Sequence, residues 1–487
     1  MLQSSLKQYT YGQDKASLPA DTITLALSKL QSSTLPILAE IFSLAQYDKI
    51  GIPVYTCILN PKLSPQIPAK GTFGKGINQE QAKASALMEL VERFSGFSFL
   101  KRLDRFLITK YAEVQAKAIL LDYLLYPFSS VYRETDTLLA LKEVPLSWAK
   151  GFDLIEGEEV LLPLHWFHRI YGTTGWAAGN SKEEAILQAL CEVIERHCVS
   201  TVIEEKLVVP TIDPQTIKGN LAKALIEKIT QAGIELIFKD FSLDLGIPTI
   251  AVISHDPNPI VPTLKFYAAA GTHLNPEFAL IRALTELVQH RAQIIYRETI
   301  QKQSGGPTYC FPLFKTKAEV EFLFQGETIS FEMLPRFSSP DFKVEIEHLL
   351  FLLKQQSFRA YVVETTHKVL GIPAVIVTIP GARLNRPSTK IHPYLFVARQ
   401  LMDIGQYQRA TAFLEKAFMV QPSIKNSPQI LCQAAVCYKK AGHYKKAATY
   451  FQQALEHAPY LLQSSKFMSD FMEVLKKVQE NKSAEKN

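Results

Sequence analysis

Glutamates at a repeated spacing are the residues of this sequence best suited to chemistry. The segments Glu89–Arg93 and Glu192–Arg196 both read Glu-x-x-Glu-Arg, and Glu286–Gln289 repeats the pattern as Glu-x-x-Gln. Residues three apart on a helix share one face, so each pair brings acidic or amide side chains together. Carboxylates held this close repel unless a cation lies between them, and Mg²⁺ takes such oxygen ligands and shares them with substrate phosphates. The pattern therefore predicts a magnesium and phosphate site built from several helices.

A glycine-containing loop precedes each of these helices. Gly76 stands 13 positions before Glu89, Gly179 stands 13 positions before Glu192, and Gly271 precedes the third helix. Backbone N–H groups at a helix N-terminus favour anions. We therefore expect the loops to bring such N–H groups toward phosphate, and the arginines that end the first two patterns to pair with a carboxylate or reach a phosphate oxygen.

Other chemistries fit these residues less well. One Glu-x-x-Glu-Arg pattern is usually a solvated helix face, but its repetition and its apolar flanks favour a buried site. A di-iron carboxylate site needs Glu-x-x-His on two helices, and neither Glu89 nor Glu192 has a histidine three residues later. The sequence also lacks a Gly-x-x-x-x-Gly-Lys-Ser/Thr loop and the protein-kinase signatures, so the common phosphate-binding motifs are excluded.

The elements that must position these helices belong to a globular chain of more than one domain. The 487 residues are 47% hydrophobic and 21% charged. No apolar run reaches the length of about 18 residues that a membrane helix needs, and the N-terminus lacks a signal-peptide pattern. A cytoplasmic protein without a membrane partner is expected. The scattered cysteines form no Cys-x-x-Cys motif and are expected to be reduced and mostly buried; they are Cys57, Cys191, Cys198, Cys310, Cys432 and Cys437.

Charge is distributed unevenly along the chain. Residues 388–487 contain 14 Lys+Arg and 7 Asp+Glu, a balance of +7, and the whole chain carries +6, so residues 1–387 sum to −1. A nucleic-acid enzyme would concentrate its basic residues on the catalytic part, so no nucleic-acid partner is expected. The basic C-terminal part is interpreted as a helical surface that faces solvent or an acidic partner.

The C-terminal part contains a repeat. Gly405, Tyr407, Ala410 and Pro422 each have a counterpart of the same type 37 residues later. This order is typical of tetratricopeptide helix–turn–helix units, which bind proteins. We expect an all-α repeat domain over residues 388–487 that ends in a helix at Leu461–Val478. Pro380–Pro387 is the predicted linker before it.

Helical and strand patterns alternate through residues 1–387, which predicts an α/β or α+β domain with helices packed on sheets. The predicted elements are a helix over Asp21–Leu44 interrupted near Pro36, a strand over Gly51–Leu59, a β-hairpin over Ser147–Pro163 that turns at Glu156-Gly157, neighbouring strands over Glu235–Phe238 and Ile247–Ser254, and a strand over Ile372–Thr378.

The three loop–helix segments resemble the hallmark blocks of the YcaO family. These segments are Gly74–Phe97, Ala178–Cys198 and Ala270–Arg291, and the stretches Tyr47–Val54, Asp240–Pro248 and Ile379–Gly381 fit the same family pattern. The resemblance covers roughly residues 10–385. It implies that residues 1–387 are an ATP-binding catalytic domain of mixed sheets with packed helices that form a nucleotide site. A tetratricopeptide-type C-terminal extension also occurs in members linked to ribosomal-protein methylthiolation.

The resemblance implies an enzyme that uses ATP and Mg²⁺ to phosphorylate a backbone amide oxygen of a peptide or a ribosomal protein. Attack by a neighbouring side chain then yields an azoline, and attack by external sulfide yields a thioamide. Azoline-forming members end in Pro-x-Pro-x-Pro, whereas this chain ends in Lys-Ser-Ala-Glu-Lys-Asn. Thioamide formation or ribosomal-protein modification is therefore expected. The alternatives are a non-catalytic accessory protein that binds ATP and recruits a methylthiotransferase through its repeats, and a degenerate scaffold. A homodimer is one possible oligomeric state, which the sequence does not decide.

Site residues follow from the resemblance position by position. The magnesium-binding positions are Glu89, Glu92, Glu192, Glu195 and Glu286, and the nucleotide-contacting positions are Ser85, Asn180, Gln188, Arg196 and Arg282. Ala177 stands where the family has a serine, and Thr174 where it has an asparagine, so nucleotide affinity is expected to be reduced. Lys7 or Lys15 is a candidate phosphate contact. No catalytic residue is assigned.

Overall fold

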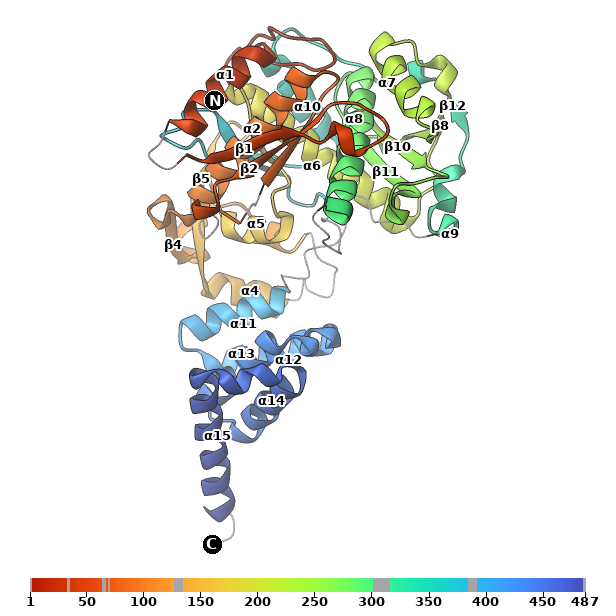
Figure 1. Cartoon of the computed structure of the whole chain (residues 1–487). Coiled ribbons are helices and arrows are strands. Elements are labelled where there is room, and N and C mark those ends of the chain that lie inside the picture. Colours follow the sequence, from red (N-terminus) through yellow and green to blue (C-terminus); the bar gives the residue numbers. More distant parts are fainter. Residues whose placement is uncertain are drawn as a thin grey trace. The chain divides into compact units, whose positions relative to one another are not determined.

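A computed structural model describes residues 2–32, 36–63, 67–68, 71–126, 135–300, 316–383 and 392–484. The chain divides into two compact units, one of residues 1–106 and 149–386 and one of residues 107–148 and 387–487 (Figure 1). Residues 107–148, which the sequence pattern assigns to a domain of residues 1–387, group here with the C-terminal residues. Cys310 and the predicted linker beyond Arg383 lie outside the described residues.

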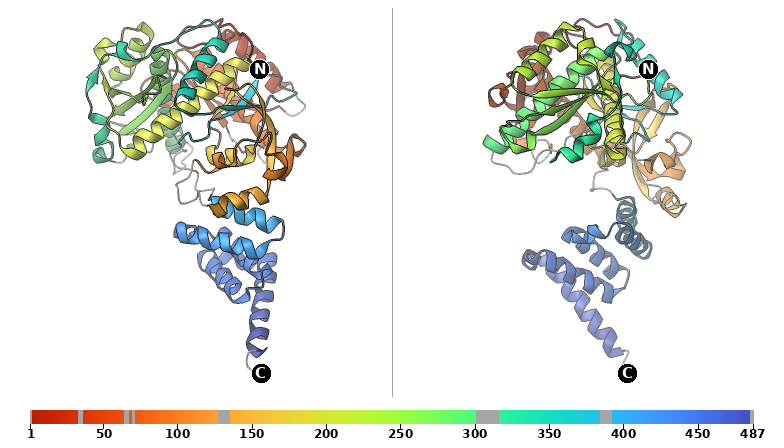
Figure 2. Two further views of the ribbon diagram at one scale, coloured as in Figure 1. Left: turned by 180° about the vertical axis from the view of Figure 1, so that it is seen from behind. Right: turned by 90° about the vertical axis from the view of Figure 1, so that its right-hand side faces the viewer.

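Three sheets of mainly antiparallel strands form the framework, and all their residues except 107–110 and 145–148 belong to the first unit. Figure 2 gives two further views of the ribbon. The sheet of three strands contains β1 (Leu38–Ser43), β2 (Val54–Leu59) and β3 (Gly71–Lys75) in that order. The sheet of five has the order β11 (Phe266–Thr272), β10 (Thr249–His255), β9 (Glu235–Asp240), β8 (Thr211–Ile212) and β12 (Thr328–Ile329). The sheet of six has the order β4 (Phe106–Lys110), β5 (Pro145–Asp153), β13 (Tyr361–Glu364), β14 (Ala374–Thr378) and β7 (Trp176–Ala178), with β6 (Glu159–Leu162) beside β5.

Long helices pack on these sheets, which confirms the expected α+β class. Helix α2 (Gln79–Lys101) packs on β3, α6 (Lys182–Glu205) on β14, and α8 (Pro276–Ile295) on β11. The remaining helices of this unit are α1 (Pro19–Gln31), α5 (Leu164–Tyr171), α7 (Asn220–Gln231), α9 (Lys317–Val320) and α10 (Phe342–Gln355). The three long helices are buried over much of their surface, as expected of helices inside a domain.

Two glycines within strands β3 and β11 explain how closely helix and strand approach. A Cβ on Gly74 would lie 2.1 Å from the backbone N of Ala86 in α2, and a Cβ on Gly271 would lie 2.3 Å from the backbone O of Ala279 in α8. Only glycine fits at such positions. The helix N-termini are capped by side chains, since Asn78, Ser181 and Asn275 each accept a backbone N–H hydrogen bond. The glycines therefore allow the helices to pack closely on the strands, and each cap satisfies one N–H group at its helix N-terminus.

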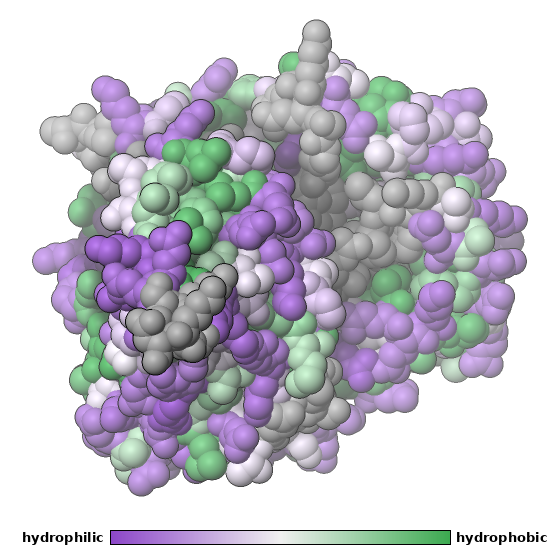
Figure 3. Space-filling view, turned by 90° about the horizontal axis from the view of Figure 1, so that it is seen from below, coloured by the Kyte–Doolittle hydropathy of each residue, from purple (hydrophilic) through white to green (hydrophobic). Residues whose placement is uncertain are grey.

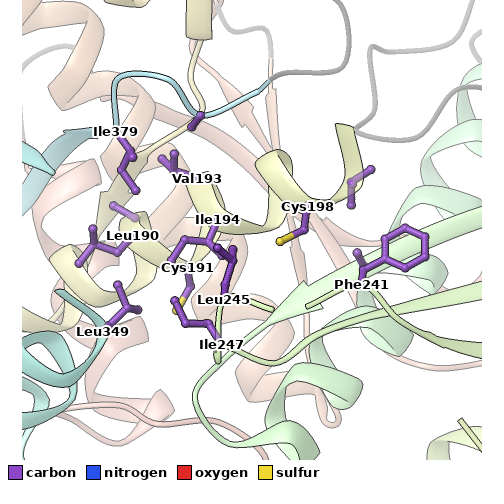
Figure 4. Close-up of a cluster of buried hydrophobic side chains, with 14 of the residues drawn as sticks. Leu190, Cys191, Val193, Ile194, Cys198, Phe241, Leu245, Ile247, Leu349 and Ile379 are labelled. Atoms are coloured by element: carbon purple, nitrogen blue, oxygen red, sulfur yellow. The ribbon is translucent and has the colours of Figure 1, made fainter. Parts of the chain in front are cut away.

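Helix α6 contributes many side chains to one buried core cluster of the described residues. Its Leu190, Val193 and Ile194 lie in one buried apolar cluster with Ile247 and other side chains from β10, α10 and the end of β14 (Figure 4). Cys191 and Cys198 belong to the same cluster as buried thiols. Within the described part of the chain the cysteines are unpaired, and four of those five are buried, as predicted.

Several predicted elements are confirmed, and one is wrong in part. Strands β5 and β6 form the expected hairpin, β9 pairs antiparallel with β10, and β2 and β14 lie where predicted. The helix predicted over Asp21–Leu44 ends at Gln31, and Leu38–Ser43 form strand β1. Ile41 of β1 pairs with Cys57 of β2 in an antiparallel ladder. Pairing with a neighbouring strand decides the structure of such a short apolar segment more strongly than its local helix propensity.

The second unit contains the predicted helical repeats. The helices are α11 (Pro393–Asp403), α12 (Tyr407–Val420), α13 (Pro428–Lys440), α14 (Tyr444–His457) and α15 (Ser465–Ala484). Gly405 and Gly442 make the turns within the two pairs with φ of 78° and 82°, and Ala410 and Ala447 are fully buried. The terminal helix begins later than predicted because a 3₁₀ turn occupies Pro459–Gln463.

Residues 107–148 add further elements to this unit, including α3 (Tyr111–Val114) and α4 (Thr135–Glu143). Helix α4 packs on α11 and buries Ala140 and Leu141. Lys416 Nζ of α12 lies 3.3 Å from Asp136 Oδ2 of α4. The inserted segment is thus a structural part of the helical unit.

No helix among the described residues has both the length and the apolar character needed to cross a bilayer. The face drawn in Figure 3 shows hydrophobic side chains as separate areas among hydrophilic ones.

Candidate nucleotide and metal site

A cavity of about 280 Å³ in the first unit lies among the three long helices, strand β3 and the N-terminal segment. All ten residues selected from the sequence line it, namely Ser85, Glu89 and Glu92 of α2, Asn180 at the start of α6, Gln188, Glu192, Glu195 and Arg196 of α6, and Arg282 and Glu286 of α8. Three segments that are about 100 residues apart in the sequence thus place their polar faces around one space.

The carboxylates of α2 are paired with an arginine of the same helix. Arg93 Nη2 lies 2.9 Å from Glu89 Oε1, and Nη1 contacts Glu92 Oε1. The backbone N–H of Phe73 in β3 donates to Glu89 Oε2 at 2.8 Å. Burial raises the pKa of Glu92 well above its usual range, and the nearby charges of Glu89 and Glu192 raise it further, against the lowering effect of Arg93. These carboxylates therefore favour an additional cation.

The carboxylates of α6 have a similar environment. Arg196 Nη2 lies 3.6 Å from Glu192 Oε1, and the backbone N–H of Gly175 donates to Glu192 Oε2 at 3.3 Å. Burial raises the pKa of Glu192. Glu195, one turn further on, is 5% exposed. The charge of Glu192 acts on Glu92, so the acidic faces of α2 and α6 converge.

The third helix departs from this pattern. In α2 and α6 the arginine follows the first glutamate by four residues, whereas Arg291 follows Glu286 by five. One extra residue turns a side chain by about 100° around a helix. Arg291 accordingly lies away from the cavity, fully buried, with Nε 3.0 Å from Asp48 Oδ2 and Nη2 3.0 Å from Asp256 Oδ2. It stabilises the core and does not serve the site.

Two other groups contact Glu286. His290 Nε2 lies 2.8 Å from Oε1, and the ammonium group of Lys75 at the end of β3 contacts Oε2. His290 Nδ1 lies 3.1 Å from the Tyr267 hydroxyl. Burial lowers the pKa of His290 well below its usual range, so the ring is neutral near pH 7. Burial, with the charge of Arg282, also lowers the pKa of Lys75 to about 8.

The donor set fits a magnesium-bound nucleotide. Five carboxylates supply the oxygen ligands that Mg²⁺ prefers. The Nε atoms of Arg196 and Arg282 are buried and have no hydrogen-bond partner within the described ranges. Buried N–H groups are rarely left unpaired, so two orphaned guanidinium donors beside a cavity suit the oxygens of a bound anion. Arg282 Nη1 donates to Gln188 Oε1 at 2.6 Å, which orients it.

The N-terminal segment also lines the cavity, through Gly12, Gln13, Asp14 and Lys15. The sequence offers Lys15 of this segment as a candidate phosphate contact, but no motif or periodicity marks the other residues. Lys15 Nζ lies 3.2 Å from Glu184 Oε1. Asn180 Nδ2 donates to the other oxygen of Glu184 at 3.1 Å. Lys7 is outside the cavity lining, so only Lys15 of the two candidate lysines reaches the site.

Lys7 belongs to a buried charge cluster next to the cavity. Its Nζ lies 2.6 Å from both Asp14 Oδ2 and Glu345 Oε1. Asp14, His273 and Glu345 are close enough to hold a metal ion. However, His273 Nδ1 accepts the backbone N–H of Asn275 at 3.0 Å, which leaves the ring proton on Nε2, facing Asp14 at 3.5 Å. Nε2 therefore carries a proton and has no lone pair with which to bind a metal ion. The cation of this cluster is the ammonium group of Lys7.

The structure shows the surroundings of the two departures from the family pattern. Ala177 lines the cavity and is 1% exposed, so no hydroxyl is offered at this point. Gly175 is retained after Thr174, and its N–H holds Glu192.

Comparisons with known proteins agree with this geometry. The model of the family described as YcaO cyclodehydratase, ATP- and Mg²⁺-binding, matches residues 73–383, and a tetratricopeptide repeat model matches residues 428–461. An uncharacterised protein of Methanothermobacter thermautotrophicus is 29% identical over 379 residues, which cover 74% of this chain and 93% of that protein. The ribosomal protein S12 methylthiotransferase accessory factor YcaO of Escherichia coli is 25% identical over 240 residues, 46% of this chain and 39% of that one.

Solved structures show the same fold. The YcaO protein of Methanopyrus kandleri bound with AMPPCP and Mg²⁺ has a TM-score of 0.59 at 23% identity, over 78% of this chain and 94% of that chain. A heterocyclase in complex with substrate and cofactor has a TM-score of 0.65 at 21% identity; the match covers 79% of this chain but 54% of the heterocyclase.

Proposed function

This chain belongs to the YcaO family, with ATP and Mg²⁺ as its cofactors, and on that premise we propose that it phosphorylates a backbone amide oxygen of a polypeptide substrate. The observation that carries the proposal is the meeting of five carboxylates from three helices in one cavity with unpaired arginine N–H groups. The proposed Mg²⁺ ligands are Glu89, Glu92, Glu192, Glu195 and Glu286. The proposed nucleotide contacts are Ser85, Asn180, Gln188, Arg196 and Arg282.

Amide activation needs a phosphoryl group because resonance makes the amide oxygen a poor leaving group. In the proposed step the terminal P–O bond of ATP breaks, a P–O bond to the amide oxygen forms, and ADP leaves. Mg²⁺ held by the five glutamates would neutralise charge that develops on the transferred group. Arg196 and Arg282 direct N–H groups toward phosphate oxygens and hold them in place. Glu195 and Glu286 are buried, which limits the competition of bulk water with the amide at their end of the cavity.

We propose that external sulfide, rather than a substrate side chain, attacks the carbon of the phosphorylated amide, so that a C–S bond forms and phosphate leaves with the former amide oxygen. The proposed substrate is a peptide or a ribosomal protein. Mass spectrometry of ribosomal proteins and peptides from cells with and without the gene distinguishes the two reactions. A thioamide exchanges oxygen for sulfur, whereas an azoline loses the elements of water. A product mass that has lost water would contradict the sulfur assignment.

ATP hydrolysis by the full-length chain tests the site. We expect slow hydrolysis without a substrate that is lost in Glu92→Gln and in Glu195→Gln, because each removes a proposed metal ligand from a folded protein. Glu227→Gln is the matched control, since Glu227 is exposed on α7 and outside the cavity. Equal hydrolysis by the wild type and both site variants would exclude the proposed metal ligands.

A second function, that of an ATP-binding accessory protein, is favoured by the helical unit and by the similarity to the Escherichia coli accessory factor. In this role we propose that the repeats of residues 388–487 bind a methylthiotransferase. Deletion of these residues is a poor test, because it would uncover the face of α4 that packs on α11. A sharper test is to express the Glu92→Gln variant in cells that lack the gene. Modification of the ribosomal protein persists if the chain only recruits a partner and stops if amide activation is required.

A further inference from the structure

Each helix that carries site carboxylates needs a cation close to them in the absence of a metal ion. Helices α2 and α6 supply their own, Arg93 and Arg196, four residues after the first glutamate. Helix α8 does not, because its residue at that position is His290, and Arg291 is held in the core by Asp48 and Asp256. Arg282 of the same helix donates to Gln188 instead, so the cation that contacts Glu286 comes from outside the helix.

Lys75 supplies this charge from strand β3. It lies at the end of the strand, and its ammonium group contacts Glu286 Oε2. The Lys75 side chain is 26% exposed, and that of Glu286 is 10% exposed. Both residues line the cavity, so their ion pair borders the space that we assign to the nucleotide.

Both oxygens of Glu286 are occupied in this arrangement. His290 Nε2 lies 2.8 Å from Oε1, and Lys75 contacts Oε2. A metal ion that binds this carboxylate must therefore displace one partner. His290 is fixed at its other nitrogen by the Tyr267 hydroxyl and is enclosed in the core. Lys75 is the partner with room to move into the cavity.

Lysine suits such an exchange better than arginine. The planar guanidinium group of Arg93 contacts Glu89 and Glu92 together, an arrangement that resists displacement. An ammonium group is a compact charge on a flexible stem with three rotatable donors. It can leave a carboxylate and meet a phosphate oxygen a few ångströms away without losing a charged partner.

We propose that Lys75 is an exchangeable counterion that neutralises Glu286 in the empty site and moves to a phosphate oxygen when the metal-bound nucleotide takes Glu286. This inference rests on the proposed assignment of Glu286 as a metal ligand. The exchange keeps the site near charge balance in both states. The exchange also favours binding of the metal ion together with the nucleotide. Lys75 weakens the binding of a metal ion alone and strengthens the binding of the metal–nucleotide complex.

Binding of Mn²⁺ to the full-length chain tests the exchange without measuring activity. The electron paramagnetic resonance signal of free Mn²⁺ is followed during titration, with and without a non-hydrolysable ATP analogue. Lys75→Met is expected to bind Mn²⁺ alone about ten-fold more tightly than the wild type, because a competing charge is gone. It is expected to bind the Mn²⁺–analogue complex about ten-fold more weakly, because a phosphate partner is gone. Lys83→Met, on α2 but outside the cavity lining, is the control and should match the wild type.

The opposite signs of the two changes identify an exchangeable counterion. A Lys75→Met protein that binds Mn²⁺ alone no more tightly than the wild type overturns the inference, as does one that binds the analogue complex equally well. If the wild type takes up no Mn²⁺ even with the analogue, the proposed function itself fails. Circular dichroism checks folding, and Lys75→Gln decides the question by the same two criteria if Lys75→Met does not fold.

Discussion

Neutralising Glu92 should stabilise the metal-free protein while weakening its response to magnesium nucleotide. Glu92 is held by Arg93, an attraction of about 4 kcal/mol at roughly 4 Å and an effective dielectric of about 20. Glu89, three residues earlier on the helix, repels it by about 3 kcal/mol at roughly 5.5 Å, and Glu192 adds to that repulsion. These charge interactions nearly cancel. The desolvation of a buried carboxylate, several kcal/mol in real proteins, remains uncompensated.

Glu92→Gln removes this cost and loses part of the Arg93 contact, so we expect a net stabilisation of about 1–3 kcal/mol. At about 2 °C per kcal/mol for a chain of this size, the melting temperature of the metal-free protein should rise by roughly 2–6 °C. Magnesium and a non-hydrolysable ATP analogue at about 100 times Kd should stabilise the wild type by about 2.7 kcal/mol. The variant, which lacks a proposed ligand, should gain much less.

Differential scanning calorimetry of the wild type, Glu92→Gln and the exposed control Glu227→Gln, each with and without the ligands, measures both effects. The expected result is a crossing, with the variant more stable when empty and the wild type more stable when loaded. A metal-free variant that melts below the wild type, or that gains as much from the ligands, would refute the electrostatic reasoning.

Three further predictions concern pH, packing and the helical unit. Burial raises the pKa of Glu92 and Glu192 in the folded state, so their ionisation destabilises the folded protein. Without metal, the free energy of unfolding should therefore fall as the pH rises above about 4.5. A pH series of urea melts should show a smaller fall for Glu92→Gln than for the wild type. Gly74→Ala should destabilise the protein by at least about 2 kcal/mol, measured by urea unfolding, because its Cβ would lie 2.1 Å from the Ala86 nitrogen; unchanged stability would mean that α2 is not so close to β3. Leu141→Ala should destabilise the helical unit by about 2–4 kcal/mol, measured by protection from protease, and should leave nucleotide affinity unchanged. Protection equal to that of the wild type would show that α4 does not pack on α11.

The sequence was most informative where a local pattern coincides with a face of a long helix. The spacing within Glu89–Arg93 and Glu192–Arg196 predicts which side chains share a face, and those side chains line one cavity. The turns at Gly405 and Gly442 were likewise predictable, because the repeat spacing and glycine's conformational freedom agree.

Interactions between distant segments were not predictable in this way. Strand β1 depends on β2 as its pairing partner, and the shift of Arg291 into the core depends on Asp48 and Asp256, which no local pattern links to α8. The grouping of residues 107–148 with the repeats depends on the packing of α4 on α11. In each case the deciding partner is far away in the sequence.

Isothermal titration calorimetry with AMPPCP tests the central assignment most directly, because it asks whether the carboxylates of separate helices hold a metal-bound triphosphate together. Titration into the full-length wild type should give heat of binding that requires Mg²⁺, and this heat should be lost in Glu195→Gln, whose carboxylate lies on a different helix from that of Glu92. No heat in the wild type with Mg²⁺ present, or equal binding by Glu195→Gln, would contradict the account.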